Sequence, residues 1–365
     1  MVAATLSAAL AQQRLPGDAL EPGAGDVGFA TYDGTRPGDP ARRRFQMACW
    51  YPAVSASRTR KSMTVEEYLA LSASDDPAAG RRNAVAEYRQ LLVDNGVDGS
   101  LVSKWLVTPA RAIRDAPRAS GGAPLVLIAQ GNDQSVYDQA LLSELLASDG
   151  YVVCTAPSPV RLQGPMKSED DVLRYATAQA ALLEETARVA RRVLRAGEQS
   201  PAIVGHSFGA RAALLYAEQH GARALVSLDG GIGFAQGRDW LQGSQRERLV
   251  TRFTTPVLHV YETDEPAAAP DFTLLEALSH SERLLVHVDG LRHIDFTSAG
   301  FASGAVPGIF GDSPADLATK LSAIAAYTRA FLALHLQHDA SARALLDAPA
   351  PQWLTTRRLP AQVGR

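Results

Sequence analysis

Short runs of apolar residues alternate with stretches of helical periodicity from about residue 120 onward. Leu125–Ala129 (LVLIA) is a continuous apolar run, which is typical of a strand buried on both faces. Further strands are predicted at Tyr151–Thr155, Ala202–Val204, Ala224–Leu228, Pro256–Tyr261 and Leu284–Val288. The intervening helices are predicted at Tyr137–Ala147, 169–196, Phe208–Gln219 and Asp271–Ser281, with a last helix from about Ser313-Pro314 to about His338. Repeated β-α-β units imply an α/β fold with a mostly parallel central sheet and helices on both faces.

The pattern differs upstream of this alternation. Gly28–Tyr32 and Phe45–Tyr51 are expected to form two opening antiparallel strands. Residues 57–118 contain helical stretches at 64–71, 81–94 and 100–114 without clear strands. We therefore expect one domain over 25–338, with a helical insertion at 57–118 between the second and third strands, as a lid or a side wall. The tail 339–365 is rich in Pro, Ala and Arg and is expected to be surface packing or disorder.

The first residues leave two interpretations open. Residues 3–11 are small and apolar and end in Ala9-Leu10-Ala11, which is the form of a signal-peptidase site. No Lys or Arg precedes this run, and the run is short. Residues 1–24 are thus either the remnant of an export signal or a disordered N-terminus. The first interpretation predicts a periplasmic or secreted protein, and the second leaves a cytoplasmic one.

Composition excludes several classes of function. The formal net charge of −3 argues against a nucleic-acid partner, because phosphate binding needs a basic face. The sequence contains no stretch of about 18 consecutive apolar residues, so we expect no membrane span. No metal is expected, since no spacing of Cys and His resembles a zinc site, and no nucleotide or dinucleotide motif indicates a cofactor. A small-molecule partner remains, and nothing in the sequence indicates the oligomeric state.

The strongest chemical signal is Gly205-His206-Ser207-Phe208-Gly209, which matches G-x-S-x-G. The pattern alone is weak, but here it lies directly after an apolar strand and directly before a helix, as a nucleophile elbow requires. This sharp turn needs small flanking residues and lifts the serine hydroxyl above the sheet edge. Ser207 is therefore the predicted nucleophile of a serine hydrolase with an α/β-hydrolase fold.

A serine nucleophile needs a base within hydrogen-bond reach. Seven histidines follow Ser207, and only His293 lies in a loop just past the last predicted strand. Loops at the carboxyl ends of strands are where catalytic groups gather in open α/β sheets. His293 is therefore the predicted base.

The carboxylate that orients the base has two candidates. Asp229 follows the strand after the elbow helix, and Asp264, or a neighbouring Glu in Glu262-Thr263-Asp264-Glu265, follows the next strand. Both positions can deliver a carboxylate to the same histidine, where it fixes the tautomer and stabilises the imidazolium. The residues alone leave this choice open.

The oxyanion hole needs two backbone N–H groups. One is predicted at Phe208, directly after the nucleophile, and the other in the loop Gln130-Gly131-Asn132-Asp133 after the strand Leu125–Ala129. We expect Asn132 to be the second donor, with Gly131 as the alternative.

With these motifs in place, the sequence resembles the platelet-activating factor acetylhydrolase-like branch of the dienelactone hydrolase-type α/β-hydrolases. The resembling pieces span about residues 45–335, namely Trp50-Tyr51-Pro52, 123–131, 205–209, Leu228-Asp229-Gly230 and Arg292-His293-Ile294-Asp295-Phe296. In that family the acid leaves the strand after the elbow helix, so the resemblance favours Asp229. The chain departs from the family at Gln130-Gly131, where His-Gly is usual, and dienelactone hydrolases proper use cysteine where this chain has Ser207.

The fold that the resemblance implies places the second and fourth strands side by side, which would bring Cys49 and Cys154 close together. We expect buried thiols rather than a bridge, although export would reopen that question.

Together these features predict cleavage of a carboxylic ester through an acyl-enzyme. Amide or peptide cleavage and acyl transfer are alternatives on the same residues. A different class is a non-catalytic binding protein with a hydrolase fold, because fold alone does not establish activity.

Overall fold

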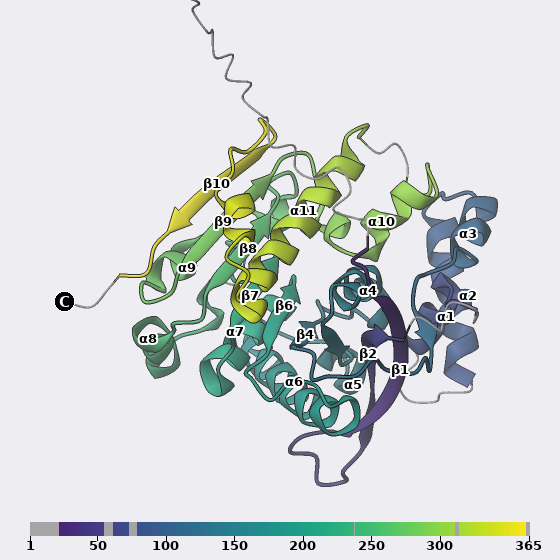
Figure 1. Ribbon diagram of the computed structural model, residues 1–365, viewed down its shortest axis with the longest axis horizontal. Coiled ribbons are helices and arrows are strands. Elements are labelled where there is room, and N and C mark those ends of the chain that lie inside the picture. Colours follow the sequence, from purple (N-terminus) through teal and green to yellow (C-terminus); the bar gives the residue numbers. More distant parts are fainter. Residues whose placement is uncertain (1–21, 55–60, 73–78, 237, 311–313, 363–365) are drawn as a thin grey trace, which may run out of the picture.

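The computed structural model describes residues 22–54, 61–72, 79–236, 238–310 and 314–362. A twisted sheet runs through this part of the chain, with helices on both sides (Figure 1). Its strands are β1 (Asp26–Thr35), β2 (Arg44–Ala53), β3 (Ile113–Arg114), β4 (Leu125–Ala129), β5 (Val152–Thr155), β6 (Ala202–His206), β7 (Ala224–Leu228), β8 (Val257–Tyr261), β9 (Arg283–Val288) and β10 (Leu354–Leu359). The order across the sheet is β10-β9-β8-β7-β6-β4-β5-β2-β1-β3.

Strands β4 to β9 form a parallel block, and antiparallel strands extend it at both ends. On one side β2 pairs antiparallel with both β5 and β1, and on the other β10 pairs antiparallel with β9. All six strands of the parallel block therefore present their carboxyl ends at one edge of the sheet, where β6 leads into the loop that carries Ser207. The mixed, mostly parallel sheet predicted from the sequence is confirmed.

The helices divide into two layers. They are α1 (Val65–Leu69), α2 (Ala79–Asp94), α3 (Gly99–Leu106), α4 (Ala140–Ser148), α5 (Pro159–Gln163), α6 (Asp171–Leu194), α7 (Gly209–His220), α8 (Gly243–Arg252), α9 (Thr273–Ala277), α10 (Ser298–Ala305), α11 (Leu317–Leu332) and α12 (Ala342–Leu346). Alternation along β4 shows the layers, because successive side chains of a strand point to opposite faces. Val126 and Ile128 belong to the core that α4 and α11 cover, whereas Leu125 and Leu127 belong to the core under α6 and α7.

Several elements differ from their predicted bounds. The helix expected over 100–114 ends at Leu106, and the chain then reaches β3, which pairs with β1. Pro109 lies between the two, and proline has no N–H with which to continue a helix. Helices α5, α8 and α10 lie in segments for which the sequence had predicted no element.

The sequence indicated surface packing or disorder for the C-terminal tail, and its described residues 339–362 include two regular elements. These are α12 and the edge strand β10. Only Leu354 is buried in this strand, while Arg357 bonds to Glu276 and Arg358 to Glu282. An edge strand with one buried residue and charged outer positions lacks the alternation by which strands are recognised in a sequence.

Cys49 and Cys154 form a disulfide, so the expectation of buried free thiols was wrong. The two residues lie directly opposite each other on the neighbouring strands β2 and β5, with their Cα atoms 4.2 Å apart. Such a separation is close to the short end of the range that a disulfide spans. The resemblance had placed these strands side by side, but no sequence signal gives the pairing register.

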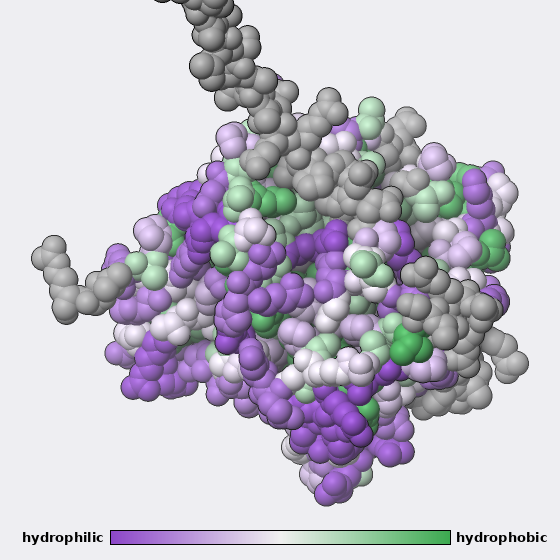
Figure 2. All heavy atoms as spheres, viewed as in Figure 1, coloured by the Kyte–Doolittle hydropathy of each residue, from purple (hydrophilic) through white to green (hydrophobic). Residues whose placement is uncertain are grey.

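On the face shown in Figure 2, hydrophobic residues are scattered among hydrophilic ones. In the described ranges, none of the helices combines the length and the apolar character that a membrane crossing requires. The segment 1–24, for which export or disorder was considered, lies almost entirely outside the described residues.

Candidate active site

Ser207 lies in a sharp turn between β6 and α7. Its φ is +52°, in the left-handed region that side chains other than glycine rarely adopt. Two backbone hydrogen bonds hold the turn, one from Ser207 N to Leu228 O at 3.2 Å and one from Gly231 N to Ser207 O at 2.7 Å. Strain of this kind persists only where the surroundings fix it, and it gathers at functional sites.

The two glycines of the motif are required by close backbone approach. A Cβ added to Gly205 would lie 2.6 Å from the Cα of Ala210, and one added to Gly209 would lie 2.0 Å from the carbonyl oxygen of Ala129. Both distances are far shorter than any van der Waals contact. The turn can therefore pack against β4 and the start of α7 only when both positions lack a side chain.

His293 and Asp229 meet although 64 residues separate them in the sequence. His293 opens the short 3₁₀ turn His293–Phe296 after β9, and Asp229 directly follows β7. The Nδ1–H of His293 donates to Oδ2 of Asp229 at 2.5 Å. Because Nδ1 carries this proton, Nε2 of the neutral ring is left as the basic nitrogen. Ser207 and His293 line the same cavity.

Asp264, the alternative acid, lies elsewhere. It is exposed in the loop after β8, while Asp229 is fully buried. Glu262, two residues before Asp264, is also fully buried, and its carboxylate accepts hydrogen bonds from the amides of Asp264 and Glu265. The structure thus brings Asp229, and not Asp264, to the imidazole.

Three carboxylates set the protonation of His293. Burial of the ring opposes its positive charge, but the hydrogen bond and charge of Asp229 and the charges of Glu265 and Glu262 outweigh that cost. The pKa of His293 is therefore raised above its ordinary value. Glu265 also anchors the loop, since its Oε1 accepts a hydrogen bond from the His293 amide at 3.0 Å.

The two expected oxyanion donors lie on the same cavity as Ser207. Within the described part of the chain, the amides of Phe208 and Asn132 donate no hydrogen bond. The amide of Gly131, the alternative to Asn132, is already occupied, because it donates to Oε1 of Gln134 at 2.6 Å. Phe208 also precedes the N-terminus of α7, whose dipole favours negative charge at this place.

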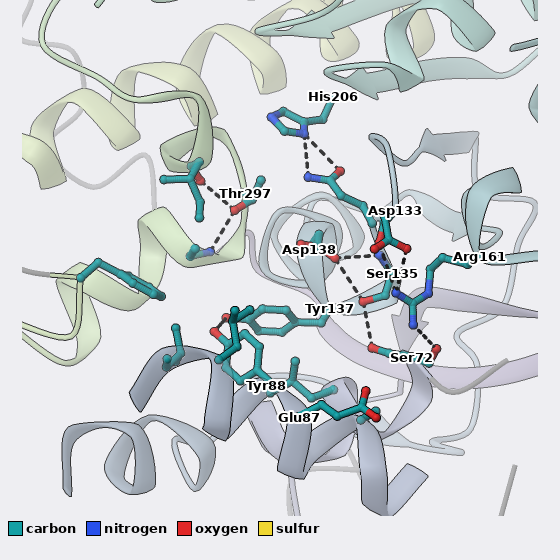
Figure 3. A pocket seen from close by; sticks show the side chains of 18 of the residues that line it. Ser72, Glu87, Tyr88, Asp133, Ser135, Tyr137, Asp138, Arg161, His206 and Thr297 are labelled. Carbon is teal, nitrogen blue, oxygen red and sulfur yellow. Dashed lines mark hydrogen bonds and ion pairs between the residues drawn. The ribbon is translucent and has the colours of Figure 1, made fainter. Parts of the chain in front are cut away.

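Two cavities meet at His293. The smaller one, of about 310 Å³, contains Ser207, and it is lined by Asn132, Met166, Glu169, Val172, Ser207, Phe208, Arg211, Gly231, Phe234, Gln236, Glu265, Ala268 and His293. The larger one, of about 680 Å³, extends from His293 and His206 to the insertion helices, where Tyr88 of α2 faces Tyr137 (Figure 3). The two cavities therefore leave space on both sides of His293.

A chain of hydrogen bonds connects the loop after β4 to His293. Gln134 accepts from Gly131 through Oε1, and its Nε2 donates to Nδ1 of His206 at 2.9 Å. Nε2 of His206 in turn donates to the carbonyl oxygen of His293 at 3.3 Å. In Figure 3, dashed lines mark the hydrogen bonds between His206 and the side-chain amide of Gln134. Burial, with the nearby charge of His293, lowers the pKa of His206 to about 3, so this ring stays neutral.

Sequence reasoning missed four residues of this site: Gln134, His206, Glu265 and Arg211. His206 was visible inside the G-x-S-x-G motif, but no spacing rule gives that position a role. The other three reach the site only through the fold. In the described residues, no group of three His, Cys, Asp or Glu side chains is arranged to hold a metal ion.

Comparisons with known proteins bear on the fold. No protein-family model matches the chain, and no curated protein matches it. Among solved structures, a ferulic acid esterase from Streptomyces cinnamoneus is similar, with a TM-score of 0.59 and 19% identity over 90% of this chain and 96% of that one. It is one of 691 matching chains, so the fold is widespread and does not by itself specify an activity. This protein therefore has a mixed fold of the α/β-hydrolase type, with a large, mostly parallel sheet flanked by helices.

Proposed function

We propose that this protein is a serine hydrolase that cleaves a carboxylic ester through an acyl-enzyme intermediate. One observation carries the proposal: the 2.5 Å hydrogen bond from His293 to the buried Asp229, made beside the cavity that contains Ser207. This bond fixes the tautomer that leaves Nε2 of His293 basic, which a serine nucleophile requires.

The reaction has two halves. His293 takes the proton of the Ser207 hydroxyl as its oxygen attacks the ester carbonyl, and the amides of Phe208 and Asn132 bind the resulting oxyanion. The tetrahedral intermediate then collapses, the ester C–O bond breaks, and His293 returns the proton to the leaving alcohol. In the second half, His293 takes a proton from a water molecule whose oxygen attacks the carbonyl carbon of the acyl-Ser207 ester. The bond from this carbon to the Ser207 oxygen then breaks, His293 returns the proton to that oxygen, and the carboxylic acid leaves.

Amide cleavage and acyl transfer would use the same groups and are the alternative activities. We favour an ester because the similar solved structure carries the name esterase. As a further proposal, the protein belongs to the platelet-activating factor acetylhydrolase-like branch of the dienelactone hydrolase type. The support for this branch is the set of sequence segments that resemble that family. A non-catalytic binding protein is the competing class.

We also propose that the protein works in an oxidising compartment, periplasmic or secreted. The support is the disulfide between Cys49 and Cys154, since such bonds persist in oxidising environments and are rare in the cytosol. Titration of the denatured, unreduced protein with a thiol reagent should find no free thiol. Two free thiols in protein isolated from its native compartment would contradict the proposal.

A panel of p-nitrophenyl esters of rising acyl length tests the activity, with the matching anilides and an alcohol acceptor in parallel. The wild type should hydrolyse esters, and Ser207→Ala should lose at least about 10³-fold in kcat. Faster turnover of anilides, or transfer to the alcohol in place of hydrolysis, would favour the alternatives. No turnover of any substrate by folded protein would favour the binding protein.

A further inference from the structure

Arg211 places a buried positive charge on the cavity of Ser207. It lies on the first turn of α7, four residues after Ser207, and lines the smaller cavity together with that serine. The residue is 8% exposed. Arginine is almost never this buried unless a carboxylate or another acceptor pairs with it.

The partners of Arg211 are neutral. Nε donates to the carbonyl oxygen of Gly231 at 3.1 Å, and Nη2 donates to that of Gln236 at 2.9 Å. The guanidinium carbon lies 5.8 Å from the ring centroid of Trp240. Among the described residues, Arg211 forms no ion pair with a carboxylate within 4.0 Å, and its side-chain hydrogen bonds come from Nε and Nη2 and not from Nη1.

Two carboxylates also line this cavity, and neither neutralises Arg211. Glu169 is exposed to solvent and acts on Arg211 only as a distant charge. Glu265 is bound to the His293 amide. Burial lowers the pKa of Arg211 to about 10, so the guanidinium remains protonated at neutral pH. The guanidinium therefore places a positive charge on this cavity, which two carbonyl oxygens hold in position and which no carboxylate neutralises.

A carboxylate is the group that this arrangement fits. Guanidinium N–H groups bind carboxylate oxygens through charge-assisted hydrogen bonds, which are stronger than those to neutral acceptors. The two carbonyl contacts already fix the guanidinium, so little ordering is needed when an anion binds.

The position of the cavity indicates which part of the ester carries the anion. Ser207, Phe208 and Asn132 line the smaller cavity and not the larger one, whereas His293 lines both. The leaving oxygen must face His293 to receive its proton, so the alcohol can extend toward the larger cavity and the acyl part remains beside Arg211.

We infer that the preferred substrate is an ester whose acyl part ends in a carboxylate, such as the half-ester of a short dicarboxylic acid, and that Arg211 binds this carboxylate. The inference rests on the proposed ester hydrolysis, whose substrate class it specifies. Arg211 is then a specificity-determining residue that contacts substrate.

The kinetic test compares monomethyl glutarate with methyl butyrate, and uses the acetate ester of glycolic acid to place the carboxylate on the alcohol side. The ratio of kcat/KM for monomethyl glutarate over methyl butyrate should exceed one in the wild type. It should fall about 30-fold or more in Arg211→Gln, since loss of one partner of a buried charge pair is costly, and should recover partly in Arg211→Lys. Arg248→Gln, which removes a half-exposed arginine of α8 outside both cavities, should keep the wild-type ratio.

Binding provides a readout that does not depend on turnover. In Ser207→Ala, calorimetry should detect monomethyl glutarate but not dimethyl glutarate, and adding Arg211→Gln should abolish the signal in protein that still melts cooperatively. A ratio unaffected by Arg211→Gln, or binding that persists without Arg211, would overturn the inference. So would a preference for the acetate of glycolic acid, which would place the anion on the alcohol.

The two proposals fail differently. Hydrolysis of neutral esters without any preference for the carboxylate would leave the proposed function standing and overturn only the substrate class. Binding of monomethyl glutarate through Arg211, with no hydrolysis of any ester, would overturn the proposed function and retain the anion site.

Discussion

The ring of His206 packs against the ring of His293, with centroids 4.6 Å apart and planes inclined by 30°. His206 also donates from Nε2 to the backbone carbonyl of His293 at 3.3 Å. His206, the residue directly before Ser207, thereby holds the loop that carries His293. Because a carbonyl oxygen can only accept, the proton of His206 lies on Nε2, and Nδ1 accepts from Nε2 of Gln134.

Substitution of His206 should therefore impair the position of the base more than substrate binding. His206→Phe keeps a ring against His293 but loses the donor, and we expect kcat to fall about tenfold, the value of one hydrogen bond, with KM little changed. His206→Gln keeps an N–H donor and should recover part of the loss. The measurement is the split of kcat and KM for both variants. A fall confined to KM, or equal losses in both variants, would contradict the role of the hydrogen bond.

The two candidate acids can be separated by paired amide substitutions. Asp229→Asn should lower kcat about 10³- to 10⁴-fold, because an amide no longer holds His293 in the required tautomer. Asp264→Asn, at an exposed side chain, is the matched control and should stay within about twofold, as surface substitutions usually do. Steady-state kinetics of the two variants decide the matter, and the reverse order would assign the acid to Asp264.

Activity should follow the protonation of His293. The base must be neutral to accept the proton of Ser207, so kcat/KM should rise with pH through the pKa of the free enzyme. Since the carboxylates raise this pKa, the midpoint of the acidic limb should lie above 6.5. Glu265→Gln removes one of these charges while keeping an acceptor for the His293 amide, so the midpoint should move to lower pH. A pH profile in which this variant shifts upward, or not at all, would refute the electrostatic account.

The packing of the elbow predicts a contrast between two glycines. Gly209→Ala would place a Cβ 2.0 Å from the Ala129 carbonyl oxygen, and we expect the free energy of unfolding to fall by at least about 3 kcal/mol, together with loss of activity. Gly99→Ala is the control, because no atom lies within 4 Å of its added Cβ and it begins helix α3. That variant should be unchanged or stabilised by up to about 1 kcal/mol. Denaturant unfolding measures both, and equal effects would show that close approach is not the reason for the glycine.

The predictability of the fold followed from how its elements are buried. Leu125–Ala129 was correctly predicted as a strand because both of its faces are covered, which makes every residue apolar. The edge strand β10 escaped prediction because solvent and ion pairs occupy most of its positions. The disulfide escaped because it depends on the register of β2 against β5, and local residues do not encode which pairs of side chains stand opposite each other.

The candidate site divides in the same way. Ser207 and His293 could be predicted because chain order and strand ends constrain where such residues lie in this kind of sheet. The choice between Asp229 and Asp264 could not be made from the residues, because both follow strands whose ends meet at one edge. Gln134 and Arg211 make their contacts with residues distant in the sequence. Only the structure therefore shows that Gln134 belongs to the hydrogen-bond chain that reaches His293 and that Arg211 lines the cavity of Ser207.

The central claim is that Ser207 is the nucleophile of an acyl-enzyme, and reaction with a fluorophosphonate tests it most directly. Intact-mass analysis should show one adduct per wild-type molecule, and peptide mapping should place it on Ser207. Ser207→Ala, folded to the same melting temperature within error, should take up none. Absence of labelling in the folded wild type, or an adduct on another residue that survives in Ser207→Ala, would contradict the account.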